Sequence, residues 1–265
     1  MNALAIRTIV RKEWAELYKN TLVLLTVALL PLFFAVLPLT ILWSTNSMDD
    51  SSAVGAGSLP SQMAPLCGDL SGGACTQVMI ASQFMILFMM IPLIIPATIV
   101  PYSIVGEKTQ RTLEPLLATP VSTSDLLLAK NLATIIPALL ATWLAFAVYA
   151  IGVRLIITDA GVLAPLFEAR WFLAVFVVSP FLALFANVIS IMVSARANDP
   201  RVAQQITSLV VFPVLLIFFG QIAGWIYFSS TFVLVMAAVV AVLDVILSLL
   251  AVRVFDREAI LTRWS

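Results

Sequence analysis

Histidine is absent from the sequence, and no stretch matches the Gly-x-x-x-x-Gly-Lys-Ser/Thr pattern that binds nucleotide phosphates. Without histidine, a Ser/His or Cys/His protease lacks its base, and a His-ligated catalytic metal lacks its ligand. Without the phosphate-binding loop, the chain has no backbone cradle for ATP. These absences predict that the chain is not an enzyme and that it holds no cofactor or metal of its own.

Charge is also scarce. Asp, Glu, Lys and Arg make up 11% of the 265 residues, 62% are hydrophobic, and the mean hydropathy is +1.09. A bilayer core about 30 Å thick needs about 20 apolar residues in a helix. The gaps between charges therefore predict an all-α polytopic membrane protein, a single domain over residues 1–265, with five or seven spans as alternatives to six. The six spans are residues 21–43, 78–105, 132–153, 171–193, 206–227 and 231–252.

The basic residues are unevenly distributed among the predicted loops. Lys and Arg are retained on the cytoplasmic side during insertion. Of the 14 basic residues, 12 fall in the termini and the even-numbered loops, and the other two are Arg154 and Arg170. This predicts a multi-pass protein of the inner (cytoplasmic) membrane with both termini in the cytoplasm. The formal net charge is zero and no surplus basic face remains, so we expect no nucleic-acid partner.

The residues before the first span, 1–20, have helical periodicity. Apolar side chains recur every three or four positions from Ile6 to Leu17, with basic side chains largely opposite. This pattern predicts an amphipathic helix on the inner leaflet. A helix that packs against another subunit would have a similar pattern, and the two interpretations are compatible.

The segment 44–77 is the long outside loop of the predicted topology. It is rich in Ser, Gly, Ala and Pro, which is typical of an irregular cap with little core of its own. Both cysteines of the chain, Cys67 and Cys75, fall in this loop, on the side where an oxidising compartment permits a disulfide. We favour a Cys67–Cys75 bridge, and two free thiols are the alternative.

Two spans carry helix-breaking residues. Pro92, Pro96 and Pro101 lie in the second span, where each removes an intrahelical hydrogen bond, so we expect a kinked and buried helix. In the fifth span, Gly220 and Gly224 form a Gly-x-x-x-Gly pair. Such a pair allows either close approach of two helices or an early break followed by a short re-entrant piece.

A few polar side chains interrupt the apolar spans. Asp244 is the only ionisable residue well inside a span, and we expect it to be hydrogen bonded to Ser248 or Asn187. A role for Asp244 in contacting an ion or a substrate is an equal alternative. Together with Gln83, Asn187 and Gln221, it marks a candidate translocation path, whose mostly apolar lining suits a hydrophobic drug or a lipid and does not exclude an ion.

The stretch between the second and third spans, residues 106–131, is the predicted cytoplasmic coupling segment. Its first half, Glu107 to Ala118, mixes charges with leucines and predicts a short amphipathic helix. A second helix begins after Pro120, where Ser122 and Asp125 resemble a capping box. An ordered element of this kind could receive force from a soluble motor, and a plain connecting helix would have the same pattern. A second turn on this side, 195–201, contains an Asp-Pro pair, and we interpret it as a simple turn.

The run from Glu107 to Val121, EKTQRTLEPLLATPV, closely resembles the signature of type-2 ABC transporter (ABC-2) permeases. The matching features are an acid-lysine pair, Thr-Leu-Glu, Leu-Leu and Thr-Pro, followed by a leucine-rich helix that ends in Lys130. Arg111 stands where the family usually has Gly. About 25 residues match as a motif, and six spans with an N-terminal surface helix extend the resemblance, which points to the bacterial sodium and drug exporter branch.

The resemblance implies an ATP-driven export permease with separate partners. It implies a second permease copy or a paralogue, and two cytosolic ATPase subunits that bind ATP and Mg. The coupling helix would insert into those subunits, with Glu107, Lys108, Arg111, Thr112 and Glu114 as candidate contacts. Dimer contacts through the first and fifth spans would give Gly220 and Gly224 a role. An ion-gradient-driven transporter that uses Asp244, or a membrane scaffold, are the alternatives.

Overall fold

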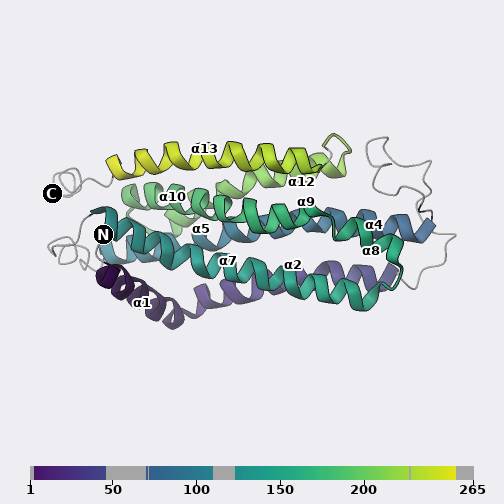
Figure 1. Cartoon of the computed structure of the whole chain (residues 1–265). Coiled ribbons are helices and arrows are strands. Elements are labelled where there is room, and N and C mark those ends of the chain that lie inside the picture. Colours follow the sequence, from purple (N-terminus) through teal and green to yellow (C-terminus); the bar gives the residue numbers. More distant parts are fainter. Residues whose placement is uncertain (1–2, 46–69, 71, 110–122, 227, 255–265) are drawn as a thin grey trace.

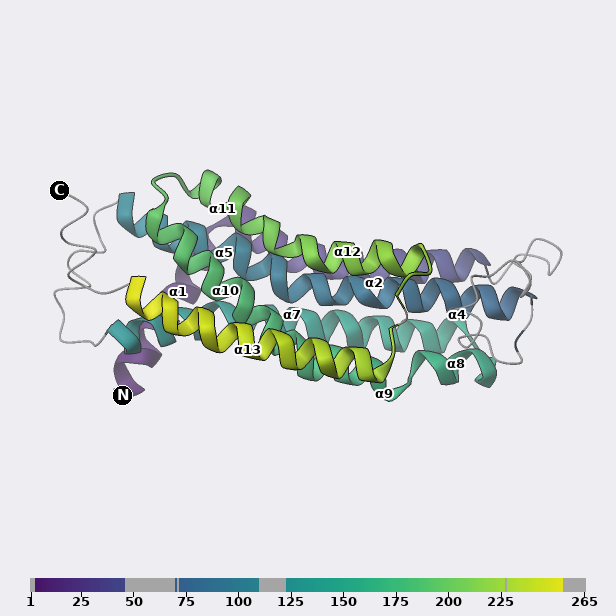
Figure 2. The ribbon, with the colours of Figure 1, turned by 90° about the horizontal axis from the view of Figure 1, so that it is seen from above.

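The computed structural model describes residues 3–45, 70, 72–109, 123–226 and 228–254, and these residues form helices and no strand. The helices run side by side along one elongated bundle (Figures 1 and 2). Six of the helical segments are long and apolar enough to cross a membrane, as the sequence predicts.

The chain begins with α1 (Ala3–Lys19), which lies at one end of the bundle at an angle to the others, followed by α2 (Thr21–Thr45). The second span is α4 (Gly72–Met85), a 3₁₀ turn η3 (Ile86–Met90) and α5 (Ile91–Thr109). The third is the single helix α7 (Thr123–Ile156). At the end of the bundle opposite α1, the short helix α8 (Ala160–Leu166) leads into the fourth span.

The fourth span consists of α9 (Ala169–Phe172), a π-helical segment η4 (Leu173–Val178) and α10 (Ser179–Arg196). The fifth consists of α11 (Pro200–Ser208), a 3₁₀ turn η5 (Leu209–Val211) and α12 (Phe212–Ile222). The last span, α13 (Ser230–Val254), is continuous.

Each change of helix type comes just before a proline. The turns η3, η4 and η5 precede Pro92, Pro180 and Pro213, each of which lies in the first turn of the α-helix that follows. Proline lacks an N–H group, and its ring clashes with the carbonyl four residues earlier, so the preceding turn departs from α-helical geometry. The α-helical geometry of the second span is therefore interrupted at η3, while Pro96 and Pro101 remain inside α5.

The second span forms the centre of the bundle. Of its most apolar window, 67% is buried inside the chain, compared with 17% for the first span and 22% for the last. Its buried side chains, such as Phe88 and Ile95, belong to the main apolar core, which also contains Tyr149 and Trp171. The predicted burial of this span is thus observed, while α2 and α13 lie at the periphery and expose large apolar side chains.

Several helix ends differ by a few residues from the predicted span boundaries. The helices of the second and third spans extend beyond the predicted spans and include Glu107, Lys108 and Lys130. Residues 44–45 and 72–77 are helical and do not belong to an irregular loop. The fifth span begins at Pro200 and ends at Ile222, short of the predicted end at 227. Residues 110–122, which include most of the predicted coupling helix, lie outside the described residues.

Candidate functional site

The candidate site lies at the end of the bundle that carries α1. Here α5 ends at Thr109 and α7 begins at Thr123, so these two helix ends flank segment 110–122. The helix α1 lies beside them (Figure 1) and packs against α7. Charged residues from all three helices meet at this point.

The central contact is a buried ion pair between α1 and α7. The Nζ atom of Lys130 lies 2.8 Å from Oε1 of Glu13, and each side chain is only 4% exposed. Ser103 of α5 donates a hydrogen bond from its hydroxyl to Oε2 of Glu13 at 2.7 Å, and it accepts one from Lys130 at 2.9 Å. Three helices thus contribute to one satisfied polar centre.

Glu107 extends this centre towards solvent. Its Oε2 atom lies 2.9 Å from Nζ of Lys130, and its Oε1 atom accepts a hydrogen bond from Lys12. The Lys12 side chain is 41% exposed and also lies 3.3 Å from Glu16. We call Lys12, Glu13, Ser103, Glu107 and Lys130 the ionic cluster. Its two cations balance its two anions, which is the condition under which buried charges are tolerated.

The cluster shifts the titration of the two charged residues that α1 supplies. Burial alone would raise the pKa of Glu13, but the charge and hydrogen bond of Lys130, with smaller contributions from Ser103 and Lys12, outweigh it and hold this pKa below its usual value. For Lys12, burial acts to lower the pKa, but the hydrogen bond and charge of Glu107 raise it overall. Both residues are therefore held in their charged forms.

Sequence reasoning missed the ionic cluster, although a signal was present. Glu13 lies four residues after Ile9 and four before Leu17, on the apolar face of α1, where a carboxylate needs a buried partner. Trp14 adds a second link, because its Nε1 donates a hydrogen bond to the carbonyl of Ala133 at 2.9 Å. The helix α1 is therefore docked on the ends of the spans through both polar and apolar contacts.

The turn between α10 and α11 is hydrogen bonded to the same end of α5. Lys108, near the end of α5, donates hydrogen bonds to Oδ1 of Asn198 at 2.9 Å and to the carbonyl of Ala197 at 3.3 Å. Asp199 caps α11 by accepting a hydrogen bond from the backbone N–H of Arg201 at 2.7 Å. The Asp-Pro turn predicted here is therefore present, and it is anchored to α5.

The predicted coupling residues divide into two groups. Glu107 and Lys108 lie at the end of α5, and their charged groups bind other parts of the same chain. Glu107 is 6% exposed within the described part of the chain. Arg111, Thr112 and Glu114 lie outside the described residues. Their contact with an ATPase stays a prediction.

Neither predicted partner of Asp244 binds it in the described part of the chain. Asn187 donates a hydrogen bond to Oδ1 of Asn131 at 2.6 Å and accepts one from Thr134 at 2.8 Å, so it binds α7 instead of α13. Asp244 is 2% exposed, and neither of its carboxylate oxygens has a hydrogen-bond partner, Ser248 included, among the described residues.

The remaining polar positions of the candidate path lie between other helices. Gln83 of α4 donates a hydrogen bond to the carbonyl of Phe218 in α12 at 3.2 Å. Gln221, one turn further along α12, is buried, and its Oε1 atom has no partner among the described residues. Gln83 therefore lies between α4 and α12, Asn187 between α10 and α7, and Asp244 on the buried face of α13, and the described contacts do not join these residues into one path.

Gly220 and Gly224 lie at the end of α12. Gly224 has φ of 71° and lies beyond the last residue of α12. The N–H of Trp225 donates to the carbonyl of Gly220 at 2.8 Å, and that of Gly224 donates to the carbonyl of Gln221 at 3.0 Å. This is the Schellman pattern of helix termination. Of the two alternatives that the sequence offered, the early helix break is therefore the one observed within the chain, while a role of these glycines in dimer contacts stays a prediction.

Two further sequence predictions concern the cysteines and metal binding. Cys75 is disulfide-bonded, while Cys67 lies outside the described residues, so the Cys67–Cys75 pairing stays a prediction. No group of three or more His, Cys, Asp or Glu residues that could hold a metal ion occurs in the part of the chain that the structure describes.

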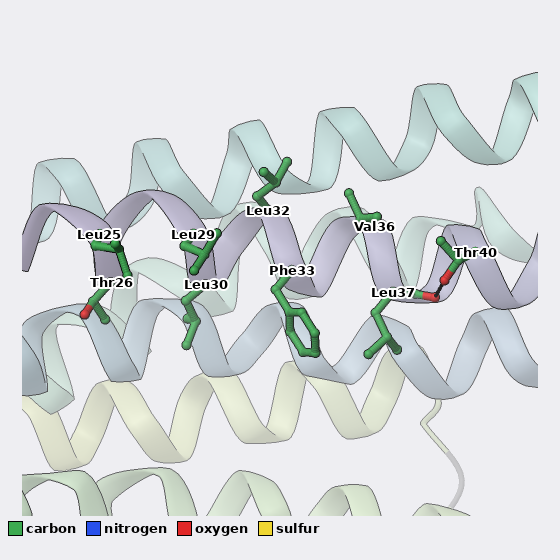
Figure 3. A pocket seen from close by; sticks show the side chains of 9 residues that line it. All are labelled: Leu25, Thr26, Leu29, Leu30, Leu32, Phe33, Val36, Leu37 and Thr40. Carbon is green, nitrogen blue, oxygen red and sulfur yellow. Dashed lines mark hydrogen bonds between the residues drawn. The ribbon is translucent and has the colours of Figure 1, made fainter. Parts of the chain in front are cut away.

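An apolar groove of about 690 Å³ runs along α2 (Figure 3). Its lining is leucines with Phe33, Val36 and two threonines. The Thr40 hydroxyl donates to the carbonyl of Leu37 in its own helix at 2.8 Å and so presents no free polar group. Such a surface suits lipid or another apolar helix and offers no group for acid-base or nucleophilic chemistry.

Comparison with known protein families gives one match that covers most of the chain. Residues 7–251 match the model of a family described as ABC-2 family transporter protein. No curated protein matched the chain in a sequence comparison. The matched region extends from α1 to near the end of α13 and includes all six spans and the ionic cluster. The chain therefore belongs to the ABC-2 transporter family, and it is a multi-pass membrane subunit of a transporter.

Proposed function

We propose that this chain is the permease subunit of an ATP-driven exporter and that segment 110–122 couples it to separate cytosolic ATPase subunits. The observation that carries the proposal is the ionic cluster. It joins α1 to α5 and α7 immediately beside the segment that resembles the ABC-2 coupling helix. A force applied to that segment would reach both spans and α1 together.

The energetics of the cluster support this role. Breaking a buried ion pair by removing one partner costs about 3–5 kcal/mol, so the three helix ends would move as one unit instead of separating. Lys108 extends the unit to the turn between α10 and α11. Four of the six spans are thereby connected at the same end of the bundle, as alternating access driven from that end requires.

The remaining parts of the proposal follow from the family and the charge pattern. Two ATPase subunits would bind ATP and Mg, and a second permease copy or a paralogue would complete the path. The end that carries α1 would face the cytoplasm, with both termini on that side of the inner membrane, since basic residues accumulate there. The direction, export, rests on the resemblance.

The proposal is tested by purifying the tagged chain from its native membrane in mild detergent and identifying the subunits that accompany it. We expect a stoichiometric ATPase subunit and ATP hydrolysis in the purified complex. An Arg111→Glu variant should lose the subunit, whereas Arg154→Glu, the same change on an exposed residue at the opposite end of α7, should retain it. A chain that purifies alone in several detergents would favour a gradient-driven transporter or a scaffold.

A further inference from the structure

A second apolar groove runs between α2 and α7. It has a volume of about 340 Å³ and shares only Leu32 with the lining of the groove shown in Figure 3. Pro31 and Ala145 in its lining are small and buried, whereas Leu140 and Leu144 are 50% and 66% exposed. The groove therefore opens to the side of the bundle, where a membrane span meets lipid.

The helix α1 bounds this groove at one end. There the groove continues into a cavity of about 160 Å³, and the two share Val27 and Pro137 in their linings. Trp14 and Tyr18 of α1 line the cavity, and the hydrogen bond from Nε1 of Trp14 to the carbonyl of Ala133 fixes the indole ring in place. Aromatic side chains thus lie at the end of the groove where the chain enters the first span (Figure 1).

The dimensions of the groove restrict its occupant. On α2 the combined lining runs from Val23 to Ala35, about 18 Å, or slightly more than half of a hydrocarbon core about 30 Å thick. The volume of 340 Å³ is spread over about 12–16 Å along the two helices, which gives a mean cross-section of about 20–30 Å². A helix about 10 Å in diameter needs about 80 Å², whereas a hydrocarbon chain packs about 4–4.5 Å from its neighbours. The groove therefore fits an acyl chain and is too narrow for a helix.

The stripe of α1 that reaches the cavity is basic. Arg7, Arg11, Trp14 and Tyr18 follow one another at spacings of four, three and four residues, so they share one face of the helix. Both arginines are exposed, and neither forms an ion pair within the described part of the chain. Glu16, the exposed acidic residue of α1, lies on the opposite face. This stripe therefore complements a negatively charged group at the membrane surface, and guanidinium groups bind phosphate through paired N–H donors.

We propose that the groove between α2 and α7 binds one anionic phospholipid, with an acyl chain in the groove and the phosphate headgroup at Arg11, one turn from Trp14. Arg7 adds positive charge to the same face. The inference goes beyond the proposed function, because it concerns a lipid held at the side of the bundle in the leaflet nearer α1. It depends neither on segment 110–122 nor on the identity of the exported molecule.

The test measures lipid binding to the purified full-length protein after delipidation. Anionic dioleoylphosphatidylglycerol and dioleoylphosphatidylcholine, which has the same chains and no net charge, are titrated in detergent, and native mass spectrometry counts the bound lipids. We expect the first phosphatidylglycerol to bind about five-fold or more tightly than phosphatidylcholine, which is the contribution of one basic residue near an anionic lipid. The same lipid should raise the unfolding temperature, since a ligand that binds only the folded state stabilises it.

Two variants identify the site, each with a matched control. Arg11→Gln should reduce the preference for phosphatidylglycerol about five-fold. Arg201→Gln removes an exposed charge at the same end of the bundle (Figure 2) and should leave the preference unaltered. Ala28→Phe should weaken the binding of both lipids, because Ala28 is exposed in the lining and a larger ring fills the groove. Ala238→Phe, at an exposed position of α13 outside the lining, should bind both lipids like the unaltered protein.

The proposal is overturned if the two lipids bind the unaltered protein equally, because the groove then holds an annular lipid only. It is also overturned if Arg11→Gln retains the full preference for phosphatidylglycerol. If Ala28→Phe changes the oligomeric state in light scattering and leaves lipid binding unaltered, the groove belongs to a second copy of the chain and the lipid site is refuted. If Ala28→Phe fails to fold, the comparison of Arg11→Gln with Arg201→Gln still decides the proposal. None of these outcomes requires the ATPase partner, so a failure here is distinct from a failure of the proposed function.

Discussion

Lys130 and Glu13 form an ion pair at 2.8 Å although 117 residues separate them along the chain. The pair converts α1 from a helix that only lies beside the spans into one that is fixed to them. Because Lys130 also binds Glu107, the position of α1 is linked to the end of α5 as well. The helix is therefore part of the mechanical unit beside segment 110–122, and its removal should affect both flanking spans.

Lys130→Met should lower the free energy of unfolding by about 3–5 kcal/mol, because it leaves two buried carboxylates with Lys12 as their remaining cation. Lys12→Met is the matched control: the Lys12 side chain is 41% exposed, so its loss should cost about 1 kcal/mol or less. Thermal unfolding in detergent, followed by tryptophan fluorescence, compares the two variants. Equal stability of both would show that the buried pair is not the dominant contact.

Protonation of Glu13 should lower the free energy of unfolding as the pH falls into the acid range. Its pKa in the folded state is lowered from the usual 4.5, so the charged form contributes stability above about that pH and loses it as the pH falls through the lower folded value. Lys12 has a raised pKa, so its contribution is present below 10.5 and is lost as the pH rises past the folded value. Unfolding temperatures measured from neutral pH into the acid range should fall less steeply for Glu13→Gln. Parallel curves would contradict this linkage.

Much of the fold could be predicted from the gaps between charges. Six apolar stretches became six spans, because few charged residues are stable within a bilayer core. The helix ends were harder to predict from charge. Glu107 and Lys130 form an ion pair, and their helices continue through both residues.

The candidate site was harder to predict, since it depends on contacts between distant segments. Asn187 was a reasonable partner for Asp244, but the register and rotation of three helices direct its amide towards Asn131 and Thr134. Gly224 matched a packing motif by spacing, and only its φ of 71° shows that it ends the helix. Local patterns predict what a residue could do, whereas tertiary packing selects among those possibilities.

Gly224→Ala should destabilise the protein by about 1–2 kcal/mol, because residues with a Cβ atom rarely adopt its left-handed conformation. Gly224→Asn should cost less, since asparagine tolerates this conformation better than alanine does. Unfolding temperature and oligomeric state, the latter by light scattering in detergent, are measured for both variants. If Gly224→Ala changes the oligomeric state but leaves stability unaltered, the residue has a packing role and the helix-end assignment fails.

Glu107→Gln and Arg111→Gln should have opposite effects, although the two residues lie only four positions apart. Glu107 is buried and bound to Lys12 and Lys130, so neutralising it should lower the unfolding temperature clearly while the folded fraction still retains the ATPase subunit. Arg111 belongs to the proposed coupling surface, so its neutralisation should leave the unfolding temperature unaltered and reduce retention of the subunit.

Both variants are purified side by side, with the amount of ATPase normalised to folded permease. Loss of the subunit in stable Glu107→Gln protein would place Glu107 at the partner surface, as the sequence alone suggested. A stable Arg111→Gln variant with full retention would instead remove this residue from the proposed contact.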